Sequence, residues 1–404
     1  MSNIITLPKP LDYQKEMLDA FVNDKIDTIV FKKGRQSGGS YFAKMVITKY
    51  LLENTNKKCM YLTPAYKLAK SFYVNLEKSL KPFIMRNNSV DLYLEFSTGS
   101  SIQFFSGHNS YKDSIRGFNA HLLIIDEAAF IDDDVYYYAI KPSSLVLGEK
   151  KLFISSPNTA QGFFYDVYNL AKNGEEGFYL KEVNIYDNPF VKEVDIEQIK
   201  RQIPKRVFKQ EYLAEFLDGD GAVFTNYKNC INDNPKLTGK YYAAIDLAKQ
   251  QDYTVLTIMN ELSQVVHIYR VTGLDYTTQV KSIVEVLNKW NPIKILVEKN
   301  NIGDAVIEML KLKWSGRISE VTLNNSLKRE LIENLVVAFE QEKISIPNND
   351  DLLRELQSFT VEYNPKTGNV FYGARIGMHD DTVISLAYAY SITKLSHKKR
   401  LDVR

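Results

Sequence analysis

Two adjacent carboxylates follow a continuous apolar run in the segment 122–130, whose sequence is Leu-Leu-Ile-Ile-Asp-Glu-Ala-Ala-Phe. Such a run is typical of a parallel strand covered on both faces, and ligands in open α/β sheets collect at the carboxyl ends of these strands. One acid there can hold a magnesium ion through water, and the next can polarise a water for attack on a γ-phosphate. We therefore assign Asp126 to the metal and Glu127 to the water. The pattern also fits a strand capped by a helix with acids near its dipole.

A glycine-rich loop lies upstream, between a β-branched strand expected at 28–31 and a helix expected at 41–46. In this context backbone N–H groups can wrap a phosphate at the helix N-terminus. The hydroxyl of Ser40, at the end of the loop, would ligate magnesium. The residues expected to contact nucleotide are Lys33, Gly34, Arg35, Gln36, Ser37, Gly38, Gly39 and Ser40.

The loop departs from the usual phosphate-binding pattern, which ends in Gly-Lys-Ser/Thr, because Gly39 occupies the lysine position. That lysine normally offsets charge on the β- and γ-phosphates, so either hydrolysis is lost or another cation replaces it. Lys33 begins the loop, and a loop that curls around phosphates brings its first and last residues to the same oxygens. We therefore expect Lys33 to supply the missing charge. Weaker substitutes are Lys32, Arg35 and Lys44.

Three further features of the first half can contact nucleotide. The Gln14 amide offers a donor and an acceptor, which match the two edge groups of adenine, although a lone glutamine is most often a surface residue. Arg116 precedes the acidic strand and is placed either to reach a neighbouring subunit's γ-phosphate or to lie in a solvated turn. A strand expected at 151–155 ends in the hydroxyls of Ser155 and Ser156, which can sense a γ-phosphate by hydrogen bonding.

Carboxylates also end two strands and begin a helix in the second half of the chain. The strand expected at 241–246 ends in Asp246, and Glu298 ends another. Asp380 and Asp381 open a helix, and both are retained because consecutive helical residues differ by about 100° in direction. Three converging carboxylates can hold two divalent ions about 4 Å apart, one activating water and one stabilising the leaving oxygen. Each acid alone also fits a helix cap or a loop.

Composition limits the other possibilities. The 404 residues allow two or three domains, since single cores stop growing at roughly 250–300 residues. A formal charge of +2, from 51 basic and 49 acidic residues, requires any DNA-binding surface to be local. Cys59 and Cys230 are far apart, so we expect reduced thiols in a cytosolic protein. No apolar run approaches the ~20 residues of a membrane span, so we expect neither secretion nor membrane insertion.

A domain boundary is expected after an amphipathic helix at 207–217, where the sequence Asp-Gly-Asp-Gly breaks the helical pattern. We therefore predict a first domain over 1–205, a linker over 206–235 and a second domain over 236–404.

Together these motifs resemble one family, the large subunit of the bacteriophage terminase, which is a DNA-packaging motor. A subset of this family places the phosphate-binding lysine at the front of the loop, where Lys33 lies. By the resemblance, the segment Ser155–Asn158 is a coupling motif that links hydrolysis to DNA movement, which adds Asn158 to the nucleotide site. The resemblance covers the chain from about Leu11 to about Ile392. It rests, in order, on Gln14, the loop Lys33–Ser40, Thr63-Pro64, Leu122–Glu127 and Ser155-Ser156-Pro157.

The resemblance implies an α/β protein in which a P-loop (ASCE-type) ATPase domain with a mainly parallel sheet precedes a ribonuclease-H-like nuclease domain. It implies ATP with Mg²⁺ in the first domain and two divalent ions, Mg²⁺ or Mn²⁺, in the second. The implied partners are double-stranded DNA, the portal protein of an empty capsid, a small terminase subunit and four further copies of the chain in a ring. The implied location is the cytoplasm of the host cell.

Two alternatives remain open from the sequence. One is an ATP-dependent helicase or restriction-like nuclease that is not linked to a capsid. However, nothing between Ser155 and Arg201 clearly supplies a second motor domain. The other is a DNA-binding scaffold that has lost ATPase activity, for which Gly39 is the only indication.

Overall fold

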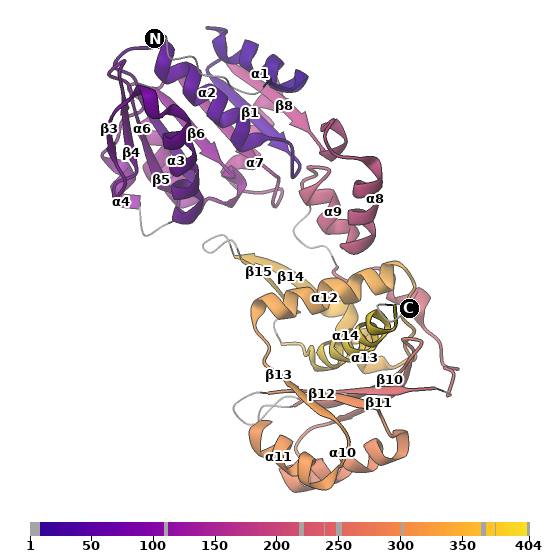
Figure 1. Ribbon diagram of the computed structural model, residues 1–404. Coiled ribbons are helices and arrows are strands. Elements are labelled where there is room, and N and C mark those ends of the chain that lie inside the picture. The colour runs from indigo at the N-terminus through magenta and orange to yellow at the C-terminus, as the bar shows by residue number, and fades with distance from the viewer. Residues whose placement is uncertain are drawn as a thin grey trace. The chain divides into compact units, whose positions relative to one another are not determined.

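The computed structural model of the protein forms two compact units, each built around its own sheet (Figure 1). Strands β1 to β8 belong to the first unit and strands β9 to β13 to the second. Helix α8 (Glu193–Gln202) lies at the division between the units. The structure describes residues 9–108, 112–217, 222–237, 239–247, 253–299, 303–364, 369–375 and 377–401.

The sheet of the first unit is mainly parallel. Its described strands follow the order β3-β4-β5-β2-β6-β7-β1-β8, and antiparallel pairing is confined to the β3-β4-β5 edge. The predicted acidic strand is β6 (Leu122–Asp126), which lies between β2 and β7. The other strands are β1 (Thr28–Lys33), β2 (Lys58–Thr63), β3 (Ile84–Asn88), β4 (Tyr93–Phe96), β5 (Ser101–Ser106), β7 (Lys150–Ser155) and β8 (Phe178–Val183).

Helices cover both faces of this sheet, which explains the uninterrupted apolar run of β6. Successive strand side chains point to opposite faces. Leu122 and Ile124 pack in the core beneath α1 to α3, whereas Leu123 and Ile125 pack in a second core with α7. The helices of the unit are α1 (Asp12–Val22), α2 (Gly39–Glu53), α3 (Tyr66–Leu80), α4 (Lys112–Arg116), α5 (Asp133–Val135), α6 (Lys141–Ser143), α7 (Phe163–Lys172) and α9 (Lys205–Glu211).

The second unit has a mixed sheet in the order β11-β10-β9-β12-β13. Strands β9 to β11 are antiparallel neighbours, and β12 and β13 run parallel to β9. Figure 1 shows helices α10 and α11 on one face and α12 to α14 on the other. A separate hydrophobic core lies on each face. The strands are β9 (Tyr241–Asp246), β10 (Thr254–Asn260), β11 (Val265–Val271), β12 (Lys294–Glu298), β13 (Ile318–Val321), β14 (Phe359–Asn364) and β15 (Asn369–Ala374). The helices are α10 (Tyr276–Trp290), α11 (Gly303–Lys313), α12 (Asn325–Glu340), α13 (Asp350–Ser358) and α14 (Asp381–Leu401).

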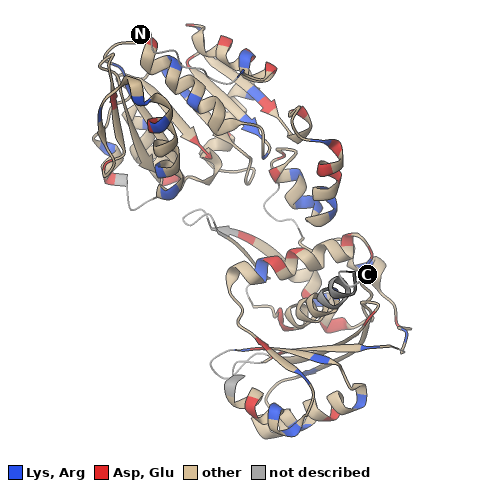
Figure 2. Ribbon diagram, viewed as in Figure 1, with Lys and Arg blue, Asp and Glu red and all other residues tan. Residues whose placement is uncertain are grey.

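Residues 206–217, which the sequence analysis placed in the linker, pack with the first unit. The glycine- and aspartate-rich segment 218–221 lies outside the described residues. Basic and acidic residues are interspersed along the chain in both units (Figure 2), and the formal net charge is +2. Cys59 and Cys230 are buried free thiols. Among the described helices, none has the length and hydrophobicity that crossing a membrane requires.

Candidate active sites

The glycine-rich loop connects the end of β1 to the start of α2, as the strand–loop–helix pattern predicts. Gly38, immediately before α2, has φ +65°, a left-handed conformation that residues with a side chain rarely adopt. A Cβ atom at Gly38 would also lie 2.8 Å from the amide nitrogen of Gln14. Gly34 has a different constraint, because a Cβ there would lie 2.3 Å from the carbonyl oxygen of Tyr212. The two glycines therefore allow backbone geometry and close packing that no other residue permits.

The side chain of Lys33 lies across Gly39. A Cβ atom at Gly39 would be 2.5 Å from Lys33 Cε and 2.7 Å from Cδ. Lys33 is only 7% exposed, and its Nζ atom is 3.0 Å from Glu127 Oε1. The loop's first residue thus brings its charge to the space beside the position where the usual lysine would stand.

The three weaker substitutes for the loop lysine have other partners. Lys32 points away from Lys33, since its Nζ atom lies 2.5 Å from Glu182 Oε1 and over the ring of Tyr168. Arg35 Nε is 2.7 Å from Glu211 Oε2. Lys44 Nζ donates to Ser79 Oγ at 2.6 Å.

Asp126 is buried at the end of β6 and accepts two hydroxyl hydrogen bonds. Ser40 Oγ and Tyr61 OH each donate to Asp126 Oδ2 at 2.8 Å. Burial raises the pKa of Asp126 and the Glu127 charge raises it further, while Lys33, Ser40 and Tyr61 oppose the shift. The Ser40 hydroxyl and the Asp126 carboxylate, which are in contact, are oxygen ligands of the kind that a magnesium ion prefers. The two residues therefore fit the implied ion.

Glu127 follows with φ +58°, in the left-handed region. Its carboxylate faces Lys33, whereas that of Asp126 faces Ser40. The turn therefore sends the two adjacent acids to different partners. Their assignments to metal and to water stay predictions.

A cavity of about 540 Å³ lies over the loop, a volume typical of small-molecule sites. Its walls include Lys33, the loop residues from Arg35 to Ser40, Glu127 and Ser156. Most of the predicted nucleotide contacts therefore share one cavity.

Gln14 lies behind the loop instead of on the cavity wall. It is 2% exposed, its Nε2 atom donates to Gly38 O at 3.3 Å, and its Oε1 atom accepts from Leu11 N at 2.9 Å. Both ends of the amide thus have partners within the chain, and its role in reading adenine stays a prediction.

The segment Ser155–Asn158 lies close to the acidic turn and to α9. Ser155 Oγ accepts from Ala129 N at 3.0 Å and donates to Ser156 O at 2.7 Å. Gln210 Nε2 donates to Pro157 O at 3.2 Å and to Asn158 Oδ1 at 3.4 Å.

Sequence reasoning missed Gln210 and Glu211, which contact the segment Ser155–Asn158 and Arg35 respectively. Both are far from the loop in sequence, with 176 positions between Arg35 and Glu211, and their residue types give no local signal.

Arg116 lies at the end of α4 with its side chain 53% exposed, and it pairs with Asp113 at 3.3 Å. This is the solvated arrangement within one subunit. Its action on a neighbouring subunit stays a prediction.

The second group of acids gathers at one end of the second sheet. Asp246 and Glu298 end the adjacent parallel strands β9 and β12, in which Ile245 pairs with Val297. Helix α14 begins at Asp381 and packs on this sheet. Burial raises the pKa of Asp246 well above its usual range, and the charges of Glu298, Asp381 and Asp380 raise it further. Acids that repel one another in this way fit cations, which relieve the repulsion.

Other side chains hold these acids in the structure. Lys328 Nζ, from α12, lies 2.7 Å from Asp380 Oδ2, and Tyr388 OH donates to Glu298 Oε2 at 3.1 Å. Tyr253 N donates to Asp381 Oδ2 at 3.4 Å. Within the described ranges, no group of three or more His, Cys, Asp or Glu side chains is arranged to hold a metal ion as it stands. The metal assignment of these acids therefore stays a prediction.

Two family models match the chain in succession. One, described as "Terminase large subunit, T4likevirus-type, N-terminal", matches residues 30–228, and the other, "Terminase RNaseH-like domain", matches residues 243–392. The chain belongs to the terminase large-subunit family. The resemblance found in the sequence is thus confirmed, and so is the fold class, a mainly parallel α/β ATPase-type domain followed by a ribonuclease-H-like domain.

Individual terminases are similar over much of the chain. The large subunit of Thermus virus P23-45 is 28% identical over 306 residues, which are 69% of this chain and 63% of that protein. That of Escherichia phage T5 is 29% identical over 211 residues, or 51% and 47% of the two chains. This chain thus spans less than two thirds of these relatives' length. A solved large terminase from a thermophilic bacteriophage has the same fold, with a TM-score of 0.59, 16% identity and coverage of 95% of this chain and 99% of that one.

Proposed function

We propose that this terminase large subunit hydrolyses ATP to translocate double-stranded DNA into empty capsids and cuts the DNA with a two-metal nuclease. The observation that carries the proposal is the pairing of Ser40 with Asp126 at 2.8 Å, beside the Lys33–Glu127 pair at the wall of a cavity. Hydroxyl, carboxylate, lysine and second carboxylate are the groups that ATP hydrolysis requires. The large terminase of the thermophilic bacteriophage has been solved with ADP and with ATP-γ-S.

Each residue of the first site has a defined task in this proposal. The loop N–H groups bind the phosphates, and Lys33 offsets charge on the β- and γ-phosphates. Mg²⁺, when bound with ATP, supplies further positive charge at the reacting phosphate. Ser40 and Asp126 hold the ion, and Glu127 orients the attacking water. Because Lys33 pairs with Glu127 in the structure, binding of a γ-phosphate would draw the lysine away and free the carboxylate.

The nuclease site uses the acids at the end of the second sheet. Two divalent ions, Mg²⁺ or Mn²⁺, would activate water and stabilise the leaving oxygen. Asp246, Glu298 and the pair Asp380 and Asp381 would hold them. The raised pKa of Asp246, which follows from burial and from the neighbouring acids, supports a site that becomes stable when cations enter.

The proposed partners follow from the family. They are double-stranded DNA, the capsid portal, a small terminase subunit and four further copies of this chain, in the cytoplasm of the host. In such a ring Arg116 would reach the γ-phosphate of a neighbouring subunit.

The alternative is a helicase or restriction-like nuclease without a capsid, and a packaging assay separates the two. Purified empty capsids, ATP and linear DNA are mixed with the protein, and DNA protected from added nuclease is measured. We expect protection with the wild type and none with Glu127→Gln, which cannot polarise water. Strand separation with no protected DNA would favour the alternative.

A further inference from the structure

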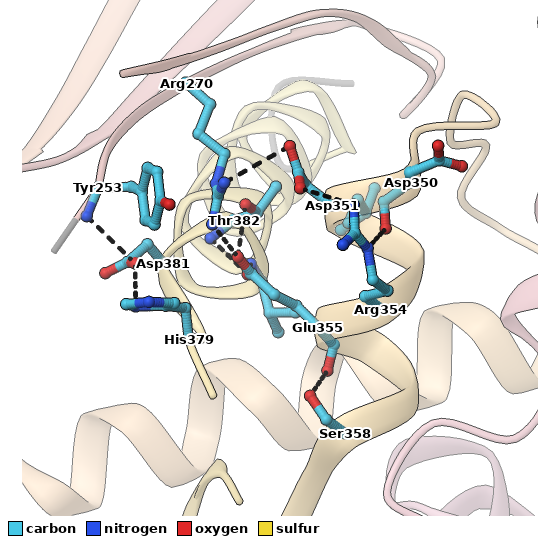
Figure 3. A network of polar contacts seen from close by, with 12 residues as sticks. Tyr253, Arg270, Asp350, Asp351, Arg354, Glu355, Ser358, His379, Asp381 and Thr382 are labelled. Carbon is cyan, nitrogen blue, oxygen red and sulfur yellow. Dashed lines mark hydrogen bonds and ion pairs between the residues drawn. The ribbon is translucent and has the colours of Figure 1, made fainter. Parts of the chain in front are cut away.

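A buried glutamate from a neighbouring helix caps the first turn of α14. Glu355, on α13, is 4% exposed. One carboxylate oxygen accepts from the backbone N–H groups of Thr382 at 2.7 Å and Val383 at 3.2 Å, and the other accepts from the Thr382 hydroxyl at 3.0 Å (Figure 3).

In most helices, a different residue accepts hydrogen bonds from these two backbone N–H groups. The first N–H groups of a helix have no acceptor within it, and the residue just before the helix usually supplies one from its side chain. Since α14 begins at Asp381, the preceding residue is Asp380, and aspartate is among the best residues for this task. Its targets would be the second and third helical N–H groups, those of Thr382 and Val383. Glu355 accepts from both.

With Glu355 capping the helix, Asp380 and Asp381 make other contacts. Asp380 Oδ2 lies 2.7 Å from Lys328 Nζ, and its charge acts on Asp246. Asp381 Oδ2 accepts from Tyr253 N. The charges of both aspartates act on Asp246 at the end of the sheet.

Arg270, on β11, fixes the capping glutamate. Its Nη2 atom lies 3.3 Å from Glu355 Oε1, and its Nη1 atom lies 3.5 Å from Asp351 Oδ2. Its guanidinium carbon is 3.4 Å from the ring centroid of Tyr253, whose backbone contacts Asp381 (Figure 3). The cap and Asp381 are thus parts of one network.

We propose that Glu355 is a positioning residue of the nuclease site: it caps α14 in place of Asp380, so the Asp380 carboxylate is not held by its own helix and can ligate a divalent ion. This inference rests on the proposed nuclease function. Without Glu355, Asp380 turns back to cap its own helix and is lost to the ion. Groups that orient a metal ligand are typically worth about 10–100-fold in metal affinity.

The test is a calorimetric titration of the full, nucleotide-free chain with Mn²⁺, in which Asp246→Ala identifies the binding that belongs to the nuclease site. We expect Glu355→Ala to weaken this binding about tenfold or more. Glu355→Gln keeps one oxygen that can accept from both N–H groups, so it should stay close to the wild type. If Glu355→Ala does not fold, Glu355→Asp carries the same expectation, because its shorter side chain retracts the carboxylate from the helix.

Leu356→Ala is the matched control for a purely structural effect. Leu356 is fully buried on the same helix, so its removal lowers the melting temperature without touching the cap. Its Mn²⁺ affinity should remain that of the wild type. Equal affinity in Glu355→Ala and the wild type, or an equal loss in Leu356→Ala, would overturn the inference. Equal binding by the wild type and Asp246→Ala would instead refute the proposed metal site itself.

Discussion

Lys33 and Gly39 occupy complementary space in the glycine-rich loop. The Lys33 Cε atom lies 2.5 Å from where a Cβ of residue 39 would be, and the Lys33 Nζ atom reaches Glu127 at 3.0 Å. A side chain at position 39 and the present path of Lys33 are therefore mutually exclusive. The replacement of the usual loop lysine by Lys33 stays a prediction, and the absence of a side chain at position 39 is what leaves room for it.

Removing the Lys33 charge should remove most of the ATPase activity. Electrostatic groups at such sites are typically worth about 10²–10³ in turnover, so Lys33→Ala should lose that factor in a steady-state phosphate-release assay. Lys44→Ala is the control, because Lys44 contacts Ser79 instead of the cavity. Lys32→Ala should lower the melting temperature, since it removes the contacts with Glu182 and Tyr168, but leave turnover nearly unchanged. Normal turnover in Lys33→Ala would make Arg35 the leading candidate.

Adding a side chain at position 39 should disturb Lys33. The Cβ of Gly39→Ala would contact the lysine stem and also approach Ile154 Cγ2, at 2.8 Å. We expect lower ATPase turnover in this variant. The double variant Lys33→Ala with Gly39→Lys should recover part of the activity lost in Lys33→Ala, because it returns the charge from the other end of the loop. If Gly39→Ala has full activity, the space at position 39 does not control Lys33.

Cleavage of DNA should depend on Asp246 and on divalent ions. Asp246→Ala should abolish cleavage of plasmid DNA, since the remaining carboxylates would hold the ions poorly. ATP turnover should stay intact, because Asp246 belongs to the second unit's sheet. A gel assay of cleavage and a phosphate-release assay on one preparation make the comparison. Wild-type cleavage that persists in EDTA would contradict the two-metal assignment.

Lys328 should compete with metal for Asp380. Its ammonium group lies 2.7 Å from Asp380 Oδ2 and neutralises the negative charge that would otherwise attract a divalent cation. Lys328→Met should therefore raise the Mn²⁺ affinity several-fold, measured by calorimetry. Lys311→Met, which removes an exposed pair with Glu320, is the control and should have no effect. A decrease in affinity would indicate that Lys328 supports the ligands instead.

Arg116 should act across subunits if it is a trans-acting residue. Rings that mix Arg116→Ala with Glu127→Ala subunits should recover some hydrolysis, because a fraction of interfaces then combines an intact arginine with an intact glutamate. Phosphate release across a series of mixing ratios measures the recovery. Its absence at every ratio would favour the solvated turn that the pairing with Asp113 presents.

Local sequence determined which segments carry the chemistry. Successive side chains of a strand point to opposite faces, so the consecutive apolar residues before Asp126 predict a strand that is covered on both faces. Strand β6 is such a strand. Strand ends at Asp246 and Glu298 and the helix start at Asp381 are equally local, since they follow from hydrophobic patterning and the placement of acids. Even the opposite directions of Lys32 and Lys33 follow from strand geometry.

Only the tertiary structure decided which of these groups meet. Lys33 reaches Glu127 across 94 positions of sequence, Glu211 reaches Arg35 across 176, and Lys328 reaches Asp380 across 52. The partners are lysines and glutamates of ordinary helices and turns, residue types that are abundant on every surface and so carry no signal of their own. Glu355 is the clearest case, because in the sequence Asp380 fits a helix cap as well as a metal ligand, and nothing near it points to Glu355. Folding places a buried carboxylate from α13 at the same N–H groups, and that contact exists only once both helices pack on one sheet.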